Sequence, residues 1–298
     1  MISLATLADS WSAFFHAPVS PTTLSLFRIV FAAILLVNAG GLVRDLRFLY
    51  GPDGALGDAY RAGGFRTGRV NLLHYCTGRM SWVWALLAIH AVAALLLLLG
   101  VHARMAAAVS FVTLTTLQSR NPLVTYGGDD VLRVMCFLLI LTPSGESLSI
   151  DRFRTAGTLI GDATVSAWSW RLMQIQVAVL YVKAALAKLA GASWYDGRAV
   201  LFATEARDFQ RRRLPVWARR HGWLRAGSWA TVVTEFALGT LIWVREFRGA
   251  TLAAGVVMHL ILERYLNLYL FGAVMIACLM LFLDPASVER TLRTAGIQ

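Results

Sequence analysis

Apolar residues in this chain are gathered into long blocks that are separated by polar connections. The blocks are roughly 16 to 25 residues long, and an α-helix needs about 20 apolar residues to cross the hydrocarbon core of a bilayer. The pattern predicts an all-α fold, a polytopic membrane helical bundle with about eight transmembrane helices. The predicted spans are residues 23–43, 81–101, 103–119, 129–146, 166–190, 228–244, 249–265 and 267–284. The last two are so closely connected that seven spans and a re-entrant segment are the alternative.

Composition supports a membrane chain. Of 298 residues, 57% are hydrophobic and only 15% are charged, whereas soluble domains are about 25% charged. We therefore expect residues 1–298 to form one multi-pass domain in the cell membrane, with the lipid bilayer as its surroundings. Residues 1–21 contain no Lys or Arg, so we do not expect a removable signal peptide.

The net charge of +11 changes this picture little. The arginines lie in the connections between apolar blocks, as is usual in membrane proteins, and no nucleic-acid-binding motif accompanies them, so we expect no nucleic-acid partner. With eight spans, one side carries 16 basic residues and the other 7. The positive-inside rule then places the long connections 44–80 and 191–227 in the cytoplasm.

The connection 191–227 is rich in arginine and also contains large aromatic residues. One interpretation is an amphipathic helix on the membrane surface, with Phe202, Phe209, Trp217 and Trp223 facing lipid. A solvated basic loop is the alternative.

Eleven ionisable residues fall within or at the ends of the apolar segments. They are Arg28, His90, Asp129, Asp130, Arg133, Arg171, Lys183, Lys188, Glu235, His259 and Glu263. A charge inside a bilayer is costly, so each residue is a candidate for function. Structural alternatives exist: Arg28 and Arg171 fit snorkelling toward the interface, His90 fits a hydrogen-bonded packing role, and Asp129 fits a helix N-cap.

Successive spans alternate in direction, and this places part of the set together. In an eight-span arrangement one half of the bilayer holds Asp129, Arg133, Lys188, Glu235, His259 and Glu263. The clustering predicts a polar cavity that opens toward the two long connections.

The chain contains only two lysines, Lys183 and Lys188, and both lie in one apolar segment. They are about 7.5 Å apart along a helix and about 140° apart around it, so we expect them to point in different directions. A lysine in a low-dielectric cavity can act as a base. The structural alternative is a buried ion pair with a glutamate that joins two helices.

Three stretches share a family pattern. Residues 181–200, YVKAALAKLAGASWYDGRAV, carry Tyr181, then Lys188-Leu, then Trp-x-x-Gly. Residues 119–152 carry Asn121, then Gly-Gly-Asp129-x-x-x-Arg133, then Ser-Ile-Asp. With LFRIVFAAILL and FLYGPDGAL near the start, they resemble the HTTM domain, the membrane domain that vitamin K-dependent γ-carboxylases share with bacterial relatives.

The resemblance implies roles for these residues. In the carboxylases the lysine of the Lys-Leu pattern deprotonates reduced vitamin K, and this lysine matches Lys188. Lys188 would then be the base, with Asp129, Glu235 and His259 as further catalytic residues. The remaining cavity residues would be Arg133, which would counter a carboxylate, together with Glu263, Tyr181 and Asn121. A reduced quinone of the vitamin K type is the implied cofactor, and no metal is expected.

The pattern also differs from the carboxylases, since Gly128-Asp129 stands where they carry Asn-His. If the chain is an enzyme, the resemblance implies carboxylase-like chemistry of the lyase or ligase type. The expected function is a quinone-linked modifier or maturation factor of secreted peptides. The alternatives are a non-catalytic membrane accessory or immunity protein and, third, a small transporter.

Overall fold

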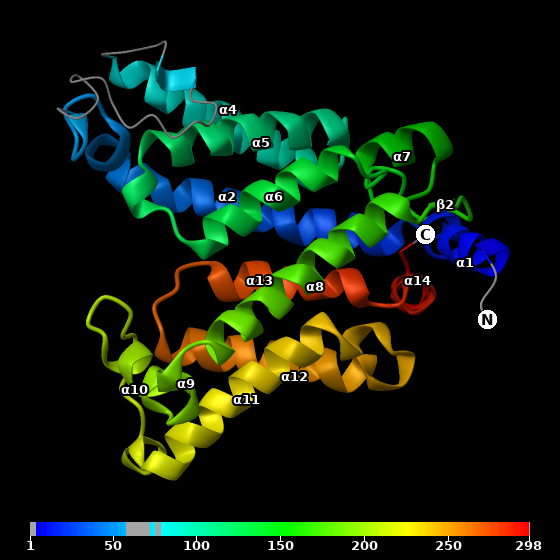
Figure 1. Ribbon diagram of the computed structural model, residues 1–298. Helices are drawn as coiled ribbons and strands as arrows, with labels where there is room; N and C mark the ends of the chain where they lie inside the picture. Colours follow the sequence, from blue (N-terminus) through cyan, green and yellow to red (C-terminus); the bar gives the residue numbers. More distant parts are fainter. Residues whose placement is uncertain (1–3, 58–71, 75–78, 298) are drawn as a thin grey trace. The chain divides into compact units, whose positions relative to one another are not determined.

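The computed structural model describes residues 4–57, 72–74 and 79–297, and α-helices make up most of them (Figure 1). The chain divides into two compact units. Unit 1 comprises Met1–Arg171 and Leu283–Gln298, and unit 2 comprises Leu172–Phe282. Each unit is described here by itself.

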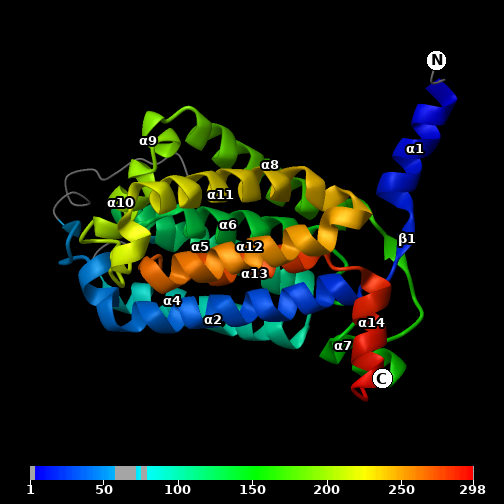
Figure 2. The ribbon, with the colours of Figure 1, turned by 90° about the horizontal axis from the view of Figure 1, so that it is seen from below.

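Unit 1 is built around four helices that pack side by side in chain order, α2, α4, α5 and α6 (Figure 1). Its helices are α1 (Leu4–His16), α2 (Thr22–Tyr50), α4 (Met80–Leu99), α5 (Ala103–Arg120), α6 (Gly127–Ile140), α7 (Ile150–Ala156) and α14 (Pro285–Thr294), with short turns η1 (Leu72–His74) and η2 (Pro122–Val124). Strands β1 (Pro18–Val19) and β2 (Val165–Ser166) pair antiparallel. α14 packs against α2 (Figure 2).

Arg28 is completely buried in unit 1, and the snorkelling interpretation of this residue is wrong. Its Nη1 donates to the carbonyl of Ser144 at 2.6 Å and its Nη2 donates to the carbonyl of Leu148 at 2.5 Å. The guanidinium therefore supplies donors to carbonyls of the loop after α6, which are outside any helix. A Cβ at Gly100 would lie 2.7 Å from Nη1, and its left-handed φ of +70° also favours glycine there.

His90 also has a structural partner. Its Nδ1 lies 2.9 Å from Thr113 Oγ1, joining α4 to α5, and the side chain is fully buried. The predicted hydrogen-bonded packing role of His90 is confirmed.

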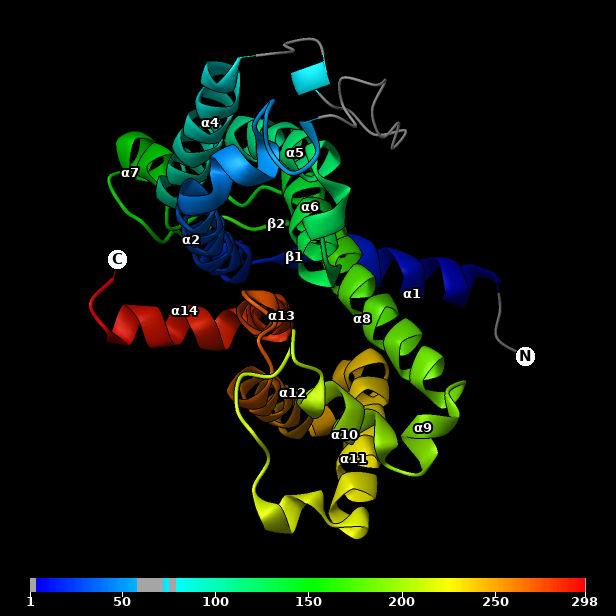
Figure 3. The same cartoon turned by 90° about the vertical axis from the view of Figure 1, so that its left-hand side faces the viewer.

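Unit 2 contains most of α8 (Trp168–Leu189) and the helices that follow it. These are α9 (Ala192–Tyr195), α10 (Arg198–Glu205), η3 (Val216–Arg219), α11 (His221–Gly239), η4 (Leu241–Trp243), α12 (Arg245–Tyr265), α13 (Phe271–Leu279) and η5 (Met280–Phe282). α11 packs on α12 and α12 packs on α13 (Figure 2). α9 and α10 contact α11 (Figure 3).

The connection 191–227 does not form one amphipathic helix. It contains α9, α10 and η3 before α11 begins at His221. Gly197 at φ +85° separates α9 from α10, and Pro215 precedes η3. Phe202, Trp217 and Trp223 are nevertheless more than half exposed.

Each of the eight predicted spans contains a helix, but the described helices differ in length and apolarity. Three are long and apolar enough to cross a membrane: α2, α4 and α8. A fourth would be added if residues 271–282 and 285–294 formed one broken span. α6 has only 14 residues, about 21 Å of helix against a hydrocarbon core of about 30 Å. The eight-span count therefore stays a prediction.

Candidate functional site

Unit 2 contains a cavity of about 690 Å³, which we call the unit 2 cavity. Residues from α8, α9, α10, η3, α11, α12 and α13 line it. Most of the lining is apolar and includes Trp194, Trp217, Trp223 and Phe271. The polar and ionisable side chains of the lining include Tyr181, Lys188, Glu235 and His259. A few polar groups in an apolar cavity are typical of a small-molecule site.

Lys188 and Glu235 form an ion pair at this cavity. Lys188, in the last turn of α8, places its Nζ 2.8 Å from the Glu235 carboxylate on α11. The two side chains are only 21% and 11% exposed. Nζ also lies 5.2 Å from the centroid of the Trp194 ring. An amine and a carboxylate at this distance in an apolar cavity can exchange a proton, and either could pass it to a bound molecule.

α8 and α11 approach each other closely at Gly239, one turn along α11 from Glu235. A Cβ at Gly239 would overlap Val182 Cγ2 and would lie 3.1 Å from the carbonyl oxygen of Ala178. The absence of a side chain at Gly239 therefore lets the two backbones approach each other.

Tyr181 and His259 form a second polar pair at the cavity. The Tyr181 hydroxyl lies 2.8 Å from His259 Nε2, and both residues are 2% exposed. If the hydroxyl donates to Nε2, the proton of the neutral imidazole lies on Nδ1. Nδ1 is buried and has no hydrogen-bond partner among the described residues. The His259 ring also packs edge-on against Phe271, with centroids 5.9 Å apart.

The two lysines differ as their spacing predicts. Lys188 lines the unit 2 cavity. Lys183 is exposed and makes no ion pair with any described residue. It therefore provides a matched control for changes at Lys188 on the same helix.

Glu263 lies next to the cavity lining but is bound to a partner that the sequence did not suggest. Its Oε1 is 2.7 Å from Arg211 Nη1. The backbone of Arg211 is also fixed in place, because its N–H donates a hydrogen bond to the carbonyl of Tyr265 at 2.9 Å. The preceding residue, Gln210, forms an antiparallel β-bridge with Leu266. The sequence indicated only that the connection 191–227 is rich in arginine, not which arginine would bind Glu263.

Three predicted site residues lie in unit 1, where each has structural partners. Asp129 accepts a hydrogen bond from the Tyr126 N–H at 3.1 Å and so caps the start of α6. Arg133 binds Asp130 at 2.5 Å and the Gln118 side chain at 2.6 Å. Tyr126 occupies the N-cap position and Asp129 the third helical position, so Asp129 acts at the start of α6 but is not the predicted N-cap residue.

Asn121 is the third, and it is buried. Its side-chain nitrogen donates to the carbonyl of Leu49 at 2.8 Å, and its oxygen accepts from the Leu123 N–H. The structure thus brings Tyr181, Lys188, Glu235 and His259 together at one cavity. A cavity shared with the residues of unit 1 stays a prediction.

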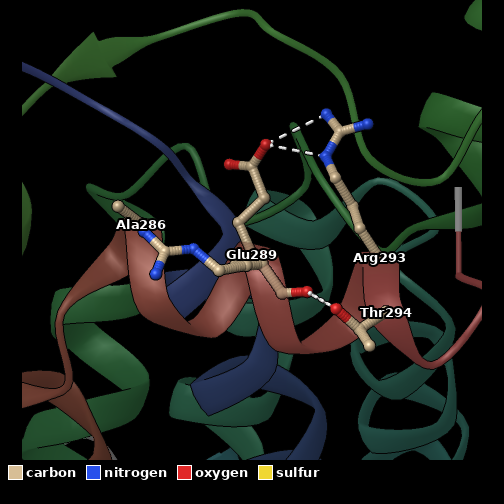
Figure 4. Close-up of a pocket in the computed structure, with 5 residues that line it drawn as sticks. Ala286, Glu289, Arg293 and Thr294 are labelled. Carbon is tan, nitrogen blue, oxygen red and sulfur yellow. Dashed lines mark hydrogen bonds and ion pairs between the residues drawn. The ribbon is translucent and has the colours of Figure 1, made fainter.

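A second pocket, of about 540 Å³, lies along α14 in unit 1 (Figure 4). Glu289 is bound there by Arg293 at 3.0 Å and by the Ser20 hydroxyl at 2.7 Å. Arg293 also contacts Asp162 at 3.1 Å. These contacts tie α14 to neighbouring segments of unit 1, and the open, charged pocket provides no apolar enclosure for a ligand.

Comparison with known proteins gives a family match over most of the chain. The model of the HTTM domain matches residues 16–286. The chain is also 26% identical over 237 residues to the uncharacterized protein YitO of Bacillus subtilis (strain 168), which covers 73% of each chain. No solved structure matches the chain.

Proposed function

Because this chain belongs to the HTTM domain family, a family of membrane proteins related to the carboxylase membrane domain, we propose that the unit 2 cavity binds a lipophilic quinol and that Lys188 is its base. The observation that carries the proposal is the Lys188–Glu235 pair at 2.8 Å in an otherwise apolar cavity of about 690 Å³.

The lining of the cavity fits a flat, apolar ring. The indoles of Trp194, Trp217 and Trp223 all line it, and aromatic rings stack on one another or meet edge to face. Apolar ligand sites generally combine such walls with a few polar groups that orient the ligand. A reduced quinone, when bound, would supply an acidic hydroxyl and two electrons.

In this proposal Lys188 accepts the hydroxyl proton of the ligand. To do so its amine must be neutral, and the carboxylate of Glu235 can take up the proton that the ammonium releases. The resulting ammonium would then lie beside the ligand oxygen and stabilise its negative charge. Tyr181 would hold His259 in one orientation at the cavity wall.

Modification of a secreted peptide is the proposed outcome, and carboxylation its chemical class. The chain carries Asp129 in place of the histidine of the carboxylases, and this side chain caps α6. We therefore propose that the step shared with the carboxylases is the abstraction of the quinol proton.

Binding and chemistry can be measured separately. A soluble menaquinol analogue is titrated into the purified chain in micelles, and binding is followed by quenching of tryptophan fluorescence. Deprotonation of the bound analogue is followed by the absorbance of its quinolate anion. We expect Lys188→Ala to abolish the quinolate signal, and Lys183→Ala to leave both signals unchanged.

Two results would contradict the proposal. If the analogue does not quench the native chain, the cavity does not bind quinols. If Lys188→Ala deprotonates the bound analogue as well as Lys183→Ala does, Lys188 is not the base. The second result, with preserved binding, would favour the non-catalytic accessory function.

A further inference from the structure

The segment 206–225 presents an unusual density of basic side chains. It contains seven arginines, all of them exposed, and a single acidic residue, Asp208. The arginines are Arg207, Arg211, Arg212, Arg213, Arg219, Arg220 and Arg225. Arg198, earlier in the connection, is neutralised by Asp196 at 2.6 Å. A hydrogen bond from the Arg198 backbone N–H lowers the pKa of Asp196, so this carboxylate stays charged.

Most of these arginines have no anionic partner among the residues that the structure describes. Arg211 pairs with Glu263 at 2.7 Å, and Arg219 reaches Glu205 only at 3.9 Å. The guanidinium groups of the other five make no ion pair with any described residue. Their charge is therefore available to a partner outside the chain.

Large apolar side chains are exposed in the same segment. Val216 is 83% exposed, and Trp217 and Trp223 are 56% and 58% exposed. The two indoles contact each other edge to face, with centroids 5.5 Å apart. Indoles are enriched where a membrane protein meets the lipid headgroups, because one part of the ring is apolar and its N–H is polar.

The segment is held in place at both ends, so the charges are presented by an ordered backbone. At one end, the Asn267 N–H donates to the carbonyl of Phe209 and the Arg211 N–H donates to that of Tyr265. At the other end the segment runs into α11, which begins at His221, and Arg219 Nε donates within the segment to the carbonyl of Leu214 at 3.1 Å.

We propose that segment 206–225 binds the headgroups of anionic phospholipids, with Arg212, Arg213 and Arg220 contacting lipid phosphates and Trp217 and Trp223 lying at headgroup depth. Charge complementarity selects an anionic lipid, and the exposed indoles favour a membrane over a soluble anion. The inference is independent of any chemistry at Lys188.

Lipid selectivity can be measured with brominated lipids, which quench tryptophan fluorescence on contact. The full chain is reconstituted in phosphatidylcholine vesicles that contain a small fraction of brominated phosphatidylcholine or brominated phosphatidylglycerol. The Trp217→Phe/Trp223→Phe variant is measured in parallel, and its signal is subtracted. We expect brominated phosphatidylglycerol to quench these two tryptophans at a mole fraction about fivefold lower than the fraction of brominated phosphatidylcholine that gives the same quenching.

The triple variant Arg212→Gln/Arg213→Gln/Arg220→Gln should reduce this ratio to about one. The matched variant Arg154→Gln/Arg245→Gln/Arg290→Gln removes the same charge from exposed arginines elsewhere and should retain the preference. Equal quenching by both lipids in the native chain, or equal loss of preference in both triple variants, would overturn the proposal.

Two measurements on the native chain need no variant. Raising the salt concentration to about 1 M should weaken the preference, because it shortens the screening length to about 3 Å. Glycerophosphate in solution should leave the preference unchanged. A preference that is insensitive to salt, or that glycerophosphate abolishes, would exclude a lipid-surface interaction.

Discussion

The ion pair between Lys188 and Glu235 allows a quantitative prediction. Lys188→Met removes the ammonium and leaves the Glu235 carboxylate 11% exposed and without a cation. At 2.8 Å and an effective dielectric constant of about 20, the Coulomb attraction is about 6 kcal/mol. The cost of desolvating both ions offsets much of this attraction.

The net effect should therefore be smaller than the gross attraction. Breaking a fully buried pair costs about 3–5 kcal/mol, and Lys188 retains 21% of its exposure. We expect Lys188→Met and Glu235→Leu each to lower the free energy of unfolding by about 2–3 kcal/mol. Because the double variant leaves no unpaired charge, it should lie within about 1 kcal/mol of the native chain.

The free energy of unfolding can be measured in mixed micelles, by titration with sodium dodecyl sulfate and helical circular dichroism. Lys183→Met, an exposed change on the same helix, should alter it by less than about 0.5 kcal/mol. The reasoning is refuted if the single variants match Lys183→Met. It is equally refuted if the double variant costs the sum of the two single variants, because the cycle would then show no coupling.

Three further changes follow from contacts in the two units, with the same unfolding measurement. Arg28→Met should lower the free energy of unfolding by about 2–4 kcal/mol, because the buried carbonyl of Ser144 and the partly buried carbonyl of Leu148 lose charged donors at 2.6 and 2.5 Å. A loss below about 1 kcal/mol would show that these two hydrogen bonds do not stabilise the loop. Tyr181→Phe should lower the free energy of unfolding by about 1–2 kcal/mol, since buried His259 loses its hydrogen-bond partner at 2.8 Å. An unchanged free energy of unfolding would show that the hydroxyl does not form a stabilising hydrogen bond with His259. Arg211→Gln should cost less than about 1 kcal/mol, because it and Glu263 are 39% and 30% exposed; a larger loss would show that this pair anchors the segment.

The helical class and the positions of the apolar segments follow from the sequence alone. Long apolar blocks must satisfy their backbone hydrogen bonds internally in lipid, and the α-helix does so within one segment. The separation of the lysines follows from the helical period, which predicts that Lys183 and Lys188 point apart. The family pattern likewise identified Lys188 and Tyr181 as cavity residues.

The partners of the polar residues were decided only by the tertiary structure. Nothing local distinguishes Arg28, which clamps a loop from inside unit 1, from an arginine that snorkels. Arg211 reaches Glu263 across 52 positions of sequence, and such long-range contacts leave no periodic signal. Hydropathy likewise located the eight segments but not the lengths of their helices. The segment predicted as 129–146 is an example: α6 ends at Ile140, and the chain then turns so that the carbonyl of Ser144 meets the Arg28 guanidinium. The sequence determined which residues are costly to bury, and the packing of the helices decided which partner stabilises each of them.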